Sequence, residues 1–147
     1  MNNKEYHNAI KAGEDDKIHE WVLSYLLKPS GNNASLAKRL NKDSVFHFGP
    51  IDYQIKDLKL ILGPDDSFKY FEEQSILDAK VLSMVESLKN GWLPEPFIAT
   101  DLWDDKLGLA DGNHRIRAFE IQGIKTHPTI FYFRNQESLE NFKNTLL

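Results

Sequence analysis

The chain has 147 residues, of which 41% are hydrophobic and 27% charged, values that fit one globular domain with a packed core. Its formal net charge of -4 argues against a polycation that coats nucleic acid regardless of sequence. The absence of cysteine excludes disulfides, thiolate catalysis and cysteine-ligated zinc. Because no apolar leader or bilayer-length apolar run is present, the sequence predicts a cytoplasmic protein without membrane contact.

The N-terminal part of the chain is predicted to be helical as far as about Lys42. Apolar residues at three- and four-residue spacing form one stripe there: Trp21, Val22, Tyr25 and Leu26. The polar run 29–33 ends this helix, and Ser35 is placed to cap a short helix that reaches Leu40. We therefore expect residues 1–44 to form an N-terminal helical extension.

The middle of the chain changes from helical spacing to a β pattern and back. Residues 45–62 are rich in β-branched and aromatic side chains, which predicts one or two strands broken at Gly49-Pro50. Residues 65–74 form a predicted polar loop. A helix then begins with a capping box made by Ser75 and Asp78 and ends at Asn90-Gly91.

The last third of the chain alternates strands and helices. Strands are predicted at residues 94–100, 107–110 and 126–133, and helices after residue 111 and over residues 138–146. This order predicts an α+β (α/β) fold, a small mixed sheet flanked by helices, over residues 45–147.

A charged cluster of small residues, 111–115 or DGNHR, stands where a predicted strand leads into a helix. Gly112 allows a tight turn, and the free N–H groups of the helix start favour phosphate. Asn113, His114 and Arg115 add hydrogen-bond donors suited to phosphate oxygens. Asp111 adds a carboxylate that would hold a metal ion or orient His114.

Structural roles explain the same residues without any ligand. Asp111 serves equally as a helix N-cap, His114 as a surface residue, and Arg115 as an ion-pair partner of Glu120. The five residues alone leave the two interpretations open.

The run 111–131, DGNHRIRAFEIQGIKTHPTIF, resembles the signature of the ParB/sulfiredoxin-like superfamily, and the block 89–99, KNGWLPEPFIA, resembles the family's preceding helix and strand. The likeness extends from about Tyr53 to Phe133, whereas the first 45 residues match no pattern of the family. It implies the ParB/sulfiredoxin-like fold, with residues 1–44 as an addition. The DGNHR form is most similar to members described as ParB-like nuclease or nucleotide-binding domains.

The resemblance separates into branches with different chemistry. Sulfiredoxins carry a cysteine where this chain has Asn113, so their thiol chemistry is excluded. Partition ParB proteins bind CTP through a Gly-Glu-Arg-Arg turn and continue into DNA-binding and dimerisation domains. The chain ends shortly after the last strand of the likeness, so we do not expect a partition role. A third branch phosphorylates free serine through an Asp-Gly-His-His-Arg turn, which DGNHR resembles well.

The resemblance implies a nucleotide ligand, CTP or ATP/ADP, bound by Gly112, Asn113, His114 and Arg115, with phosphoryl transfer or nucleotide hydrolysis as the reaction. His114 and Arg115 would hold phosphate, and Asp111 would orient His114 or bind Mg²⁺. Such a reaction needs a carboxylate base, for which Glu72 and Glu73 in the loop FEEQS are the candidates.

Two other functions stay open at this point. A Mg²⁺-dependent ParB-like nuclease would use the same motif on DNA, although the acidic net charge does not favour nucleic acid as a partner. A module that binds a partner and catalyses nothing would also fit, and so would a homodimer. We assign the scattered cations, among them Lys38, Arg39 and Lys42, to solubility. Trp92 and Trp103 are assigned to packing, with base stacking by one of them as the alternative.

Overall fold

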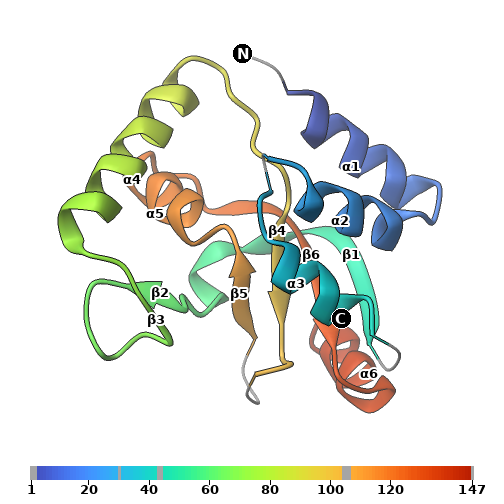
Figure 1. The fold of residues 1–147 in the computed structure, drawn as a ribbon. Coiled ribbons are helices and arrows are strands. Elements are labelled where there is room, and N and C mark those ends of the chain that lie inside the picture. The colour runs from blue at the N-terminus through green and yellow to red at the C-terminus, as the bar shows by residue number, and fades with distance from the viewer. Residues whose placement is uncertain (1–2, 30, 43–44, 104–106, 147) are drawn as a thin grey trace.

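The fold is a mixed α+β architecture, seen in a computed structural model that describes residues 3–29, 31–42, 45–103 and 107–146 (Figure 1). The helices in these ranges are α1 (Lys4–Glu14), α2 (Ile18–Leu27), α3 (Ala34–Leu40), α4 (Gln74–Lys89), α5 (Asn113–Ile121) and α6 (Gln136–Thr145). The strands are β1 (Phe46–Gln54), β2 (Leu62–Gly63), β3 (Tyr70–Phe71), β4 (Phe97–Thr100), β5 (Gly108–Asp111) and β6 (Thr126–Phe133), with a 3-10 turn, η1 (Ile55–Asp57), after β1.

One four-stranded sheet in the order β1-β6-β4-β5 forms the centre of the molecule. β6 pairs antiparallel with β1 and parallel with β4, and β4 pairs antiparallel with β5. The strands β2 and β3 form a separate, two-stranded parallel pair. The small mixed sheet flanked by helices that the sequence predicts is therefore confirmed.

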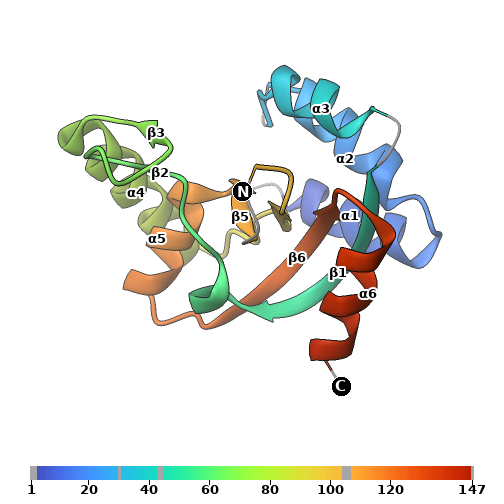
Figure 2. The ribbon, with the colours of Figure 1, turned by 90° about the horizontal axis from the view of Figure 1, so that it is seen from below.

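Helices cover both faces of the sheet, because side chains of the central strands alternate between two hydrophobic clusters. Ile98, Ile130 and Tyr132 pack with the helices α1, α2 and α3. Phe97 and Phe131, their neighbours in the chain, pack with α5 and α6 on the other face. Figure 2 shows α2 and α3 on one side of the β1–β6 ribbon and α6 on the other. The N-terminal helices thus share a core with the sheet, while residues 43 and 44, at the predicted domain boundary, lie outside the described residues.

Three local predictions need correction. β1 continues through Gly49-Pro50 instead of breaking there, and only its register with β6 shifts between Phe48 and Ile51. The predicted loop 65–74 contains the short strand β3, whose two residues pair with β2. The helix α3 is capped by Asn33, which accepts a hydrogen bond from the Leu36 N–H, and not by Ser35.

The predicted capping box of α4 is also wrong. The N-cap is Glu73, whose carboxylate accepts hydrogen bonds from the N–H groups of Ser75 and Ile76 at 3.2 and 3.4 Å. A carboxylate at the positive end of a helix gains from the helix dipole, which favours Glu73 over a serine hydroxyl as the cap. None of the helices in the described ranges is long and apolar enough to cross a membrane.

Candidate functional site

The turn between β5 and α5 depends on Gly112, which is the N-cap of α5. Its φ of 117° lies in the region that side chains rarely adopt. A Cβ atom built at Gly112 would stand 2.5 Å from Cδ1 of the buried Phe97. The turn therefore needs glycine both for its backbone conformation and for the close approach of Phe97.

Asn113 fastens the turn to a distant segment of the chain. Its Oδ1 accepts hydrogen bonds from the N–H groups of Ile61 and Leu62 at 2.9 and 3.3 Å. Its Nδ2 donates to the carbonyl of Leu109 at 2.8 Å, and the residue is only 7% exposed. The oxygen of this amide thus accepts two backbone hydrogen bonds and its nitrogen donates one, which gives the side chain a structural role.

Arg115 is buried and held by acidic and carbonyl groups. Its Nη1 donates to the carbonyl of Glu95 at 2.6 Å, and its Nη2 donates to Oδ2 of Asp111 at 2.7 Å. The guanidinium carbon lies 5.3 Å from the ring centroid of Phe97. Burial acts to lower the pKa of Arg115, but Asp111, Tyr25 and Glu95 together outweigh it and the pKa is raised. The cation of Arg115 therefore locks the turn to the segment before β4.

The carboxylate of Asp111 faces Arg115 rather than His114. Burial raises the pKa of Asp111 above its ordinary value, and the charge of Arg115 opposes that shift. A Mg²⁺ ion needs several oxygen ligands, and the described ranges contain no group of three or more His, Asp or Glu side chains placed to hold a metal. Asp111 is therefore held by Arg115 and belongs to no such group among the described residues.

His114 and Glu72 come together from positions 42 residues apart. The His114 Nε2 lies 2.6 Å from Oε1 of Glu72, and the other oxygen of Glu72 accepts from Lys80 Nζ at 2.6 Å. Burial acts to raise the pKa of Glu72, but the hydrogen bonds from Lys80 and His114 outweigh it, and the pKa is lowered. Glu72 is thus an ionised carboxylate that orients the half-buried imidazole and leaves Nδ1 as its second nitrogen.

Of the two glutamates predicted as candidates, only Glu72 lies against the turn. Glu73 is exposed and its carboxylate caps α4, where it also accepts a hydrogen bond from the Ser75 hydroxyl. These bonds to Ser75 lower the pKa of Glu73.

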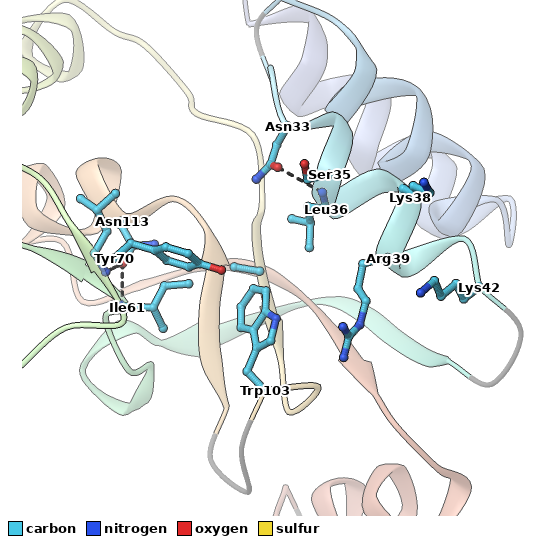
Figure 3. Close-up of a pocket in the computed structure, with 12 residues that line it drawn as sticks. Asn33, Ser35, Leu36, Lys38, Arg39, Lys42, Ile61, Tyr70, Trp103 and Asn113 are labelled. Atoms are coloured by element: carbon cyan, nitrogen blue, oxygen red, sulfur yellow. Dashed lines mark hydrogen bonds between the residues drawn. The ribbon is translucent and has the colours of Figure 1, made fainter.

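A cavity of about 620 Å³ opens beside the turn (Figure 3). One wall is α3 with the residue before it, and the opposite wall combines β2, β3 and the start of α5. The residues that line the cavity are Asn33, Ser35, Leu36, Lys38, Arg39, Lys42, Ile61, Leu62, Tyr70, Trp103, Ala110 and Asn113. Figure 3 shows the three cations of α3 and its C-terminal end on one side, Tyr70 and Asn113 on the other, and Trp103 between them.

The cations face the cavity because the opposite side of α3 is apolar. Leu36, Ala37 and Leu40 are buried in the core that α1 and α2 share with the sheet. The charged residues between and after these positions are exposed, as expected for an amphipathic helix. Lys38 and Arg39 also lie in the last turn of α3, where cations are favoured by the helix dipole.

Two aromatic side chains also line the cavity, Tyr70 on the wall opposite α3 and Trp103 between the walls, and together they are called the aromatic wall. The rings of Tyr70 and Trp103 meet edge to face with centroids 6.5 Å apart. The ammonium of Lys69 lies 5.6 Å from the centroid of Tyr70 and 5.5 Å from that of Trp103. The Tyr70 N–H donates to the carbonyl of Ile61 at 2.8 Å, and Ile61 in turn donates to Asn113. The aromatic wall is therefore connected to the turn by hydrogen bonds.

The sequence prediction missed the wall formed by α3. It assigned Lys38, Arg39 and Lys42 to solubility and gave no role to Tyr70. The available signal was the group of three cations at positions 38, 39 and 42, at the end of a short predicted helix. Lys38 and Lys42 are four residues apart and would lie on one helix face. The pairing of that face with an aromatic wall more than 25 positions later depends on the tertiary fold.

Comparison with known proteins gives one structural likeness. No family model matches the chain, and no curated protein matches it. A solved chain described as "Structure of the C2221 form of Pnob8-like ParB-N domain" is similar at a TM-score of 0.43 and 19% sequence identity. The likeness covers 71% of this chain and 36% of that chain.

Proposed function

We propose that this chain binds a nucleotide in the cavity between α3 and the aromatic wall, with the phosphates against α3 and the base against Trp103 and Tyr70. The observation that carries the proposal is the cavity itself, which combines three cations with two aromatic rings beside the DGNHR turn. Its volume of about 620 Å³ lies within the range of small-molecule sites.

The charge of the lining supports a phosphate-bearing ligand. Lys38, Arg39 and Lys42 line the cavity, and none of its lining residues in the described ranges is aspartate or glutamate. A concave surface lined by one sign of charge concentrates the opposite charge, even on a chain whose formal net charge is -4. Arginine adds a planar pair of donors that matches phosphate oxygens.

The aromatic wall supports a ligand that carries a base. Nucleobases stack on exposed tyrosine and tryptophan rings, and such stacking contributes about 1–3 kcal/mol per base. Tyr70 is 47% exposed, so its ring is available to a ligand. CTP and ATP or ADP are the nucleotides to be tested.

The DGNHR turn contributes through its backbone and its position. The first N–H groups of a helix have no partner within the helix, and Asn113 at the start of α5 lines the cavity. In this proposal Gly112, Asp111 and Arg115 are positioning residues that hold the turn, while α3 supplies the cations that contact phosphate.

The paired side chains of His114 and Glu72 supply acid-base chemistry next to the turn. Glu72 fixes the imidazole through Nε2, so Nδ1 is the nitrogen that would take a proton from an attacking water or hydroxyl. The pair does not itself line the cavity, so it would serve transfer or hydrolysis of a phosphate only where the bound ligand extends past Asn113 to the first turn of α5. A Mg²⁺ ion would be held mainly by the phosphates, as is usual for Mg²⁺ at nucleotide sites.

Nucleotide binding is tested by calorimetry and thermal unfolding with CTP, ATP and ADP, each with and without Mg²⁺. A bound nucleotide stabilises the fold by roughly 2.7 kcal/mol at a hundred times its dissociation constant. The double variant Arg39→Ala/Lys42→Ala should lose this stabilisation. The charge-matched control Lys11→Ala/Lys89→Ala, at exposed helix positions outside the cavity, should keep it. A parent that ignores all three nucleotides, or a cavity variant that binds like the control, would refute the proposal.

The chemical step is tested separately by phosphate release from whichever nucleotide binds. His114→Gln and Glu72→Gln should lower the rate by about a hundredfold while the dissociation constant changes little. Glu86→Gln, at the distal end of α4, is the matched control. A parent that binds nucleotide and releases no phosphate, with no transfer to an added hydroxyl acceptor such as serine, would show a binding module and remove the catalytic part of the proposal.

A further inference from the structure

A second, smaller hollow adjoins the main cavity at Trp103 and Ile61. Its volume is about 60 Å³, and Trp103 and Ile61 line both this hollow and the main cavity. Lys59, Ser67 and Lys69 line only the smaller hollow, whereas Tyr70 lines only the larger cavity. Trp103 therefore borders two concave spaces that both contain cationic side chains.

The size of the smaller hollow restricts its occupant. Its volume of about 60 Å³ is roughly a tenth of the 620 Å³ of the main cavity, so it takes a much smaller group than a nucleotide. A nucleoside does not fit such a volume, and a phosphate group does. The hollow is thus suited to a second anionic group that adjoins the first cavity at the Trp103 ring.

The charge of the hollow agrees with its size. Lys69 is held over the rings of Trp103 and Tyr70 by cation-π contacts at 5.5 and 5.6 Å. Aspartate and glutamate are absent from the lining in the described ranges. The Ser67 hydroxyl donates to the carboxylate of Asp65, so Lys69 rather than this hydroxyl is the group that would recognise an anion.

We propose that the smaller hollow is a phosphate subsite and that the ligand is the end of a single-stranded nucleic acid that crosses Trp103. This inference rests on the proposed binding of a nucleotide in the main cavity. In a polynucleotide, a nucleoside separates successive phosphates, which matches two cationic spaces that share an aromatic ring. A nucleoside triphosphate keeps its phosphates contiguous and matches this arrangement less well.

The test compares ligands that differ by one phosphate and one nucleoside. The dissociation constants of CMP, pCpC and CTP, and of AMP, pApA and ATP, are measured by calorimetry at several salt concentrations. Each dinucleotide should bind at least about tenfold more tightly than its mononucleotide, because it adds a charge-assisted phosphate contact. The salt dependence of its binding should be steeper by about 0.7 in the slope of log K against log salt.

Lys69→Gln should remove both the gain in affinity and the added salt slope, and Lys125→Gln, an exposed control, should keep them. Equal affinities for mono- and dinucleotides would overturn the phosphate subsite and leave nucleotide binding in place. Failure of every ligand would refute both proposals. The triphosphate could instead bind more tightly than the monophosphate by the same factor as the dinucleotide, and lose this gain in Lys69→Gln. That result would assign the hollow to the terminal phosphates of a nucleoside triphosphate and overturn the nucleic-acid inference.

Discussion

Gly112 stands where a side chain would collide with Phe97, and this contact has a measurable cost. Gly112→Ala places a methyl group 2.5 Å from Phe97 Cδ1 and forces alanine into a positive φ. We expect a loss of about 2–4 kcal/mol in the free energy of unfolding, measured by urea denaturation. Gly91→Ala is the matched control, since Gly91 has a φ of 91° but no atom within 4 Å of the added Cβ. Equal losses in the two variants would show that backbone conformation alone sets the cost.

His127 gives the fold a dependence on pH. Its Nε2–H donates to the carbonyls of Pro94 and Glu95, and its ring packs between Phe97 and Phe119. Burial lowers the pKa of His127 from 6.5 to about 4. Between these two values the unfolded chain binds a proton that the folded chain does not, so stability falls as the pH falls.

We expect the free energy of unfolding to drop by about 2 kcal/mol between pH 7 and pH 5 through this group. Urea denaturation of the parent and of His127→Gln measures it as the difference between their two pH dependences. The range above pH 5 is chosen because the lowered pKa values of Glu72 and Glu73 act at more acidic pH. Identical pH dependences in the two proteins would contradict the assignment.

At the scale of an element, α3 carries the cations of the cavity and depends on one cap. Asn33 accepts a hydrogen bond from the Leu36 N–H at 3.1 Å. Asn33→Ala should destabilise the fold by about 1 kcal/mol and weaken nucleotide binding severalfold, because α3 frays from its N-terminus. Asn135→Ala removes the corresponding cap of α6, outside the cavity, and should cost similar stability without changing affinity. Equal affinities in the two variants would separate α3 from the site.

Elements with a strong pattern were predictable from the sequence. β4 and β6 are buried on both faces, so their continuous apolar runs identify them as strands, and the periodic apolar positions of α4 identify that helix. β3 was not predictable, because its two residues are exposed and gain their pairing only from β2.

The site was predictable where its chemistry is local. The DGNHR turn was placed correctly between a strand and a helix. The carboxylate expected to orient His114 was Asp111, whereas in the structure Glu72, predicted only as a candidate base, contacts His114 and Asp111 contacts Arg115. The partner of Arg115 was not foreseen, because Glu95 lies 20 residues before it and meets it only when β4 and α5 pack together. The cavity depends in the same way on the tertiary placement of α3.

At the scale of the whole molecule, the N-terminal helices and the sheet should unfold as one unit. Leu26 of α2 is fully buried in the cluster that includes Ile98 and Ile130 of the sheet. Leu26→Ala should cost about 2–5 kcal/mol, and hydrogen exchange should show equal losses of protection in α2 and in β6. A loss confined to residues 1–44 would instead show that this segment is an independent unit.

The amide of Asn113 joins the 61–62 segment to β5 next to the backbone bridge between Lys59 and Gly108. Its oxygen accepts hydrogen bonds from the N–H groups of Ile61 and Leu62, and its nitrogen donates to the carbonyl of Leu109. The Tyr70 N–H donates a hydrogen bond to the carbonyl of Ile61 in the same segment. The first turn of α5 and the Tyr70 ring, which both line the main cavity, therefore belong to one hydrogen-bonded framework, and we expect a ligand that displaces one of them to displace the other.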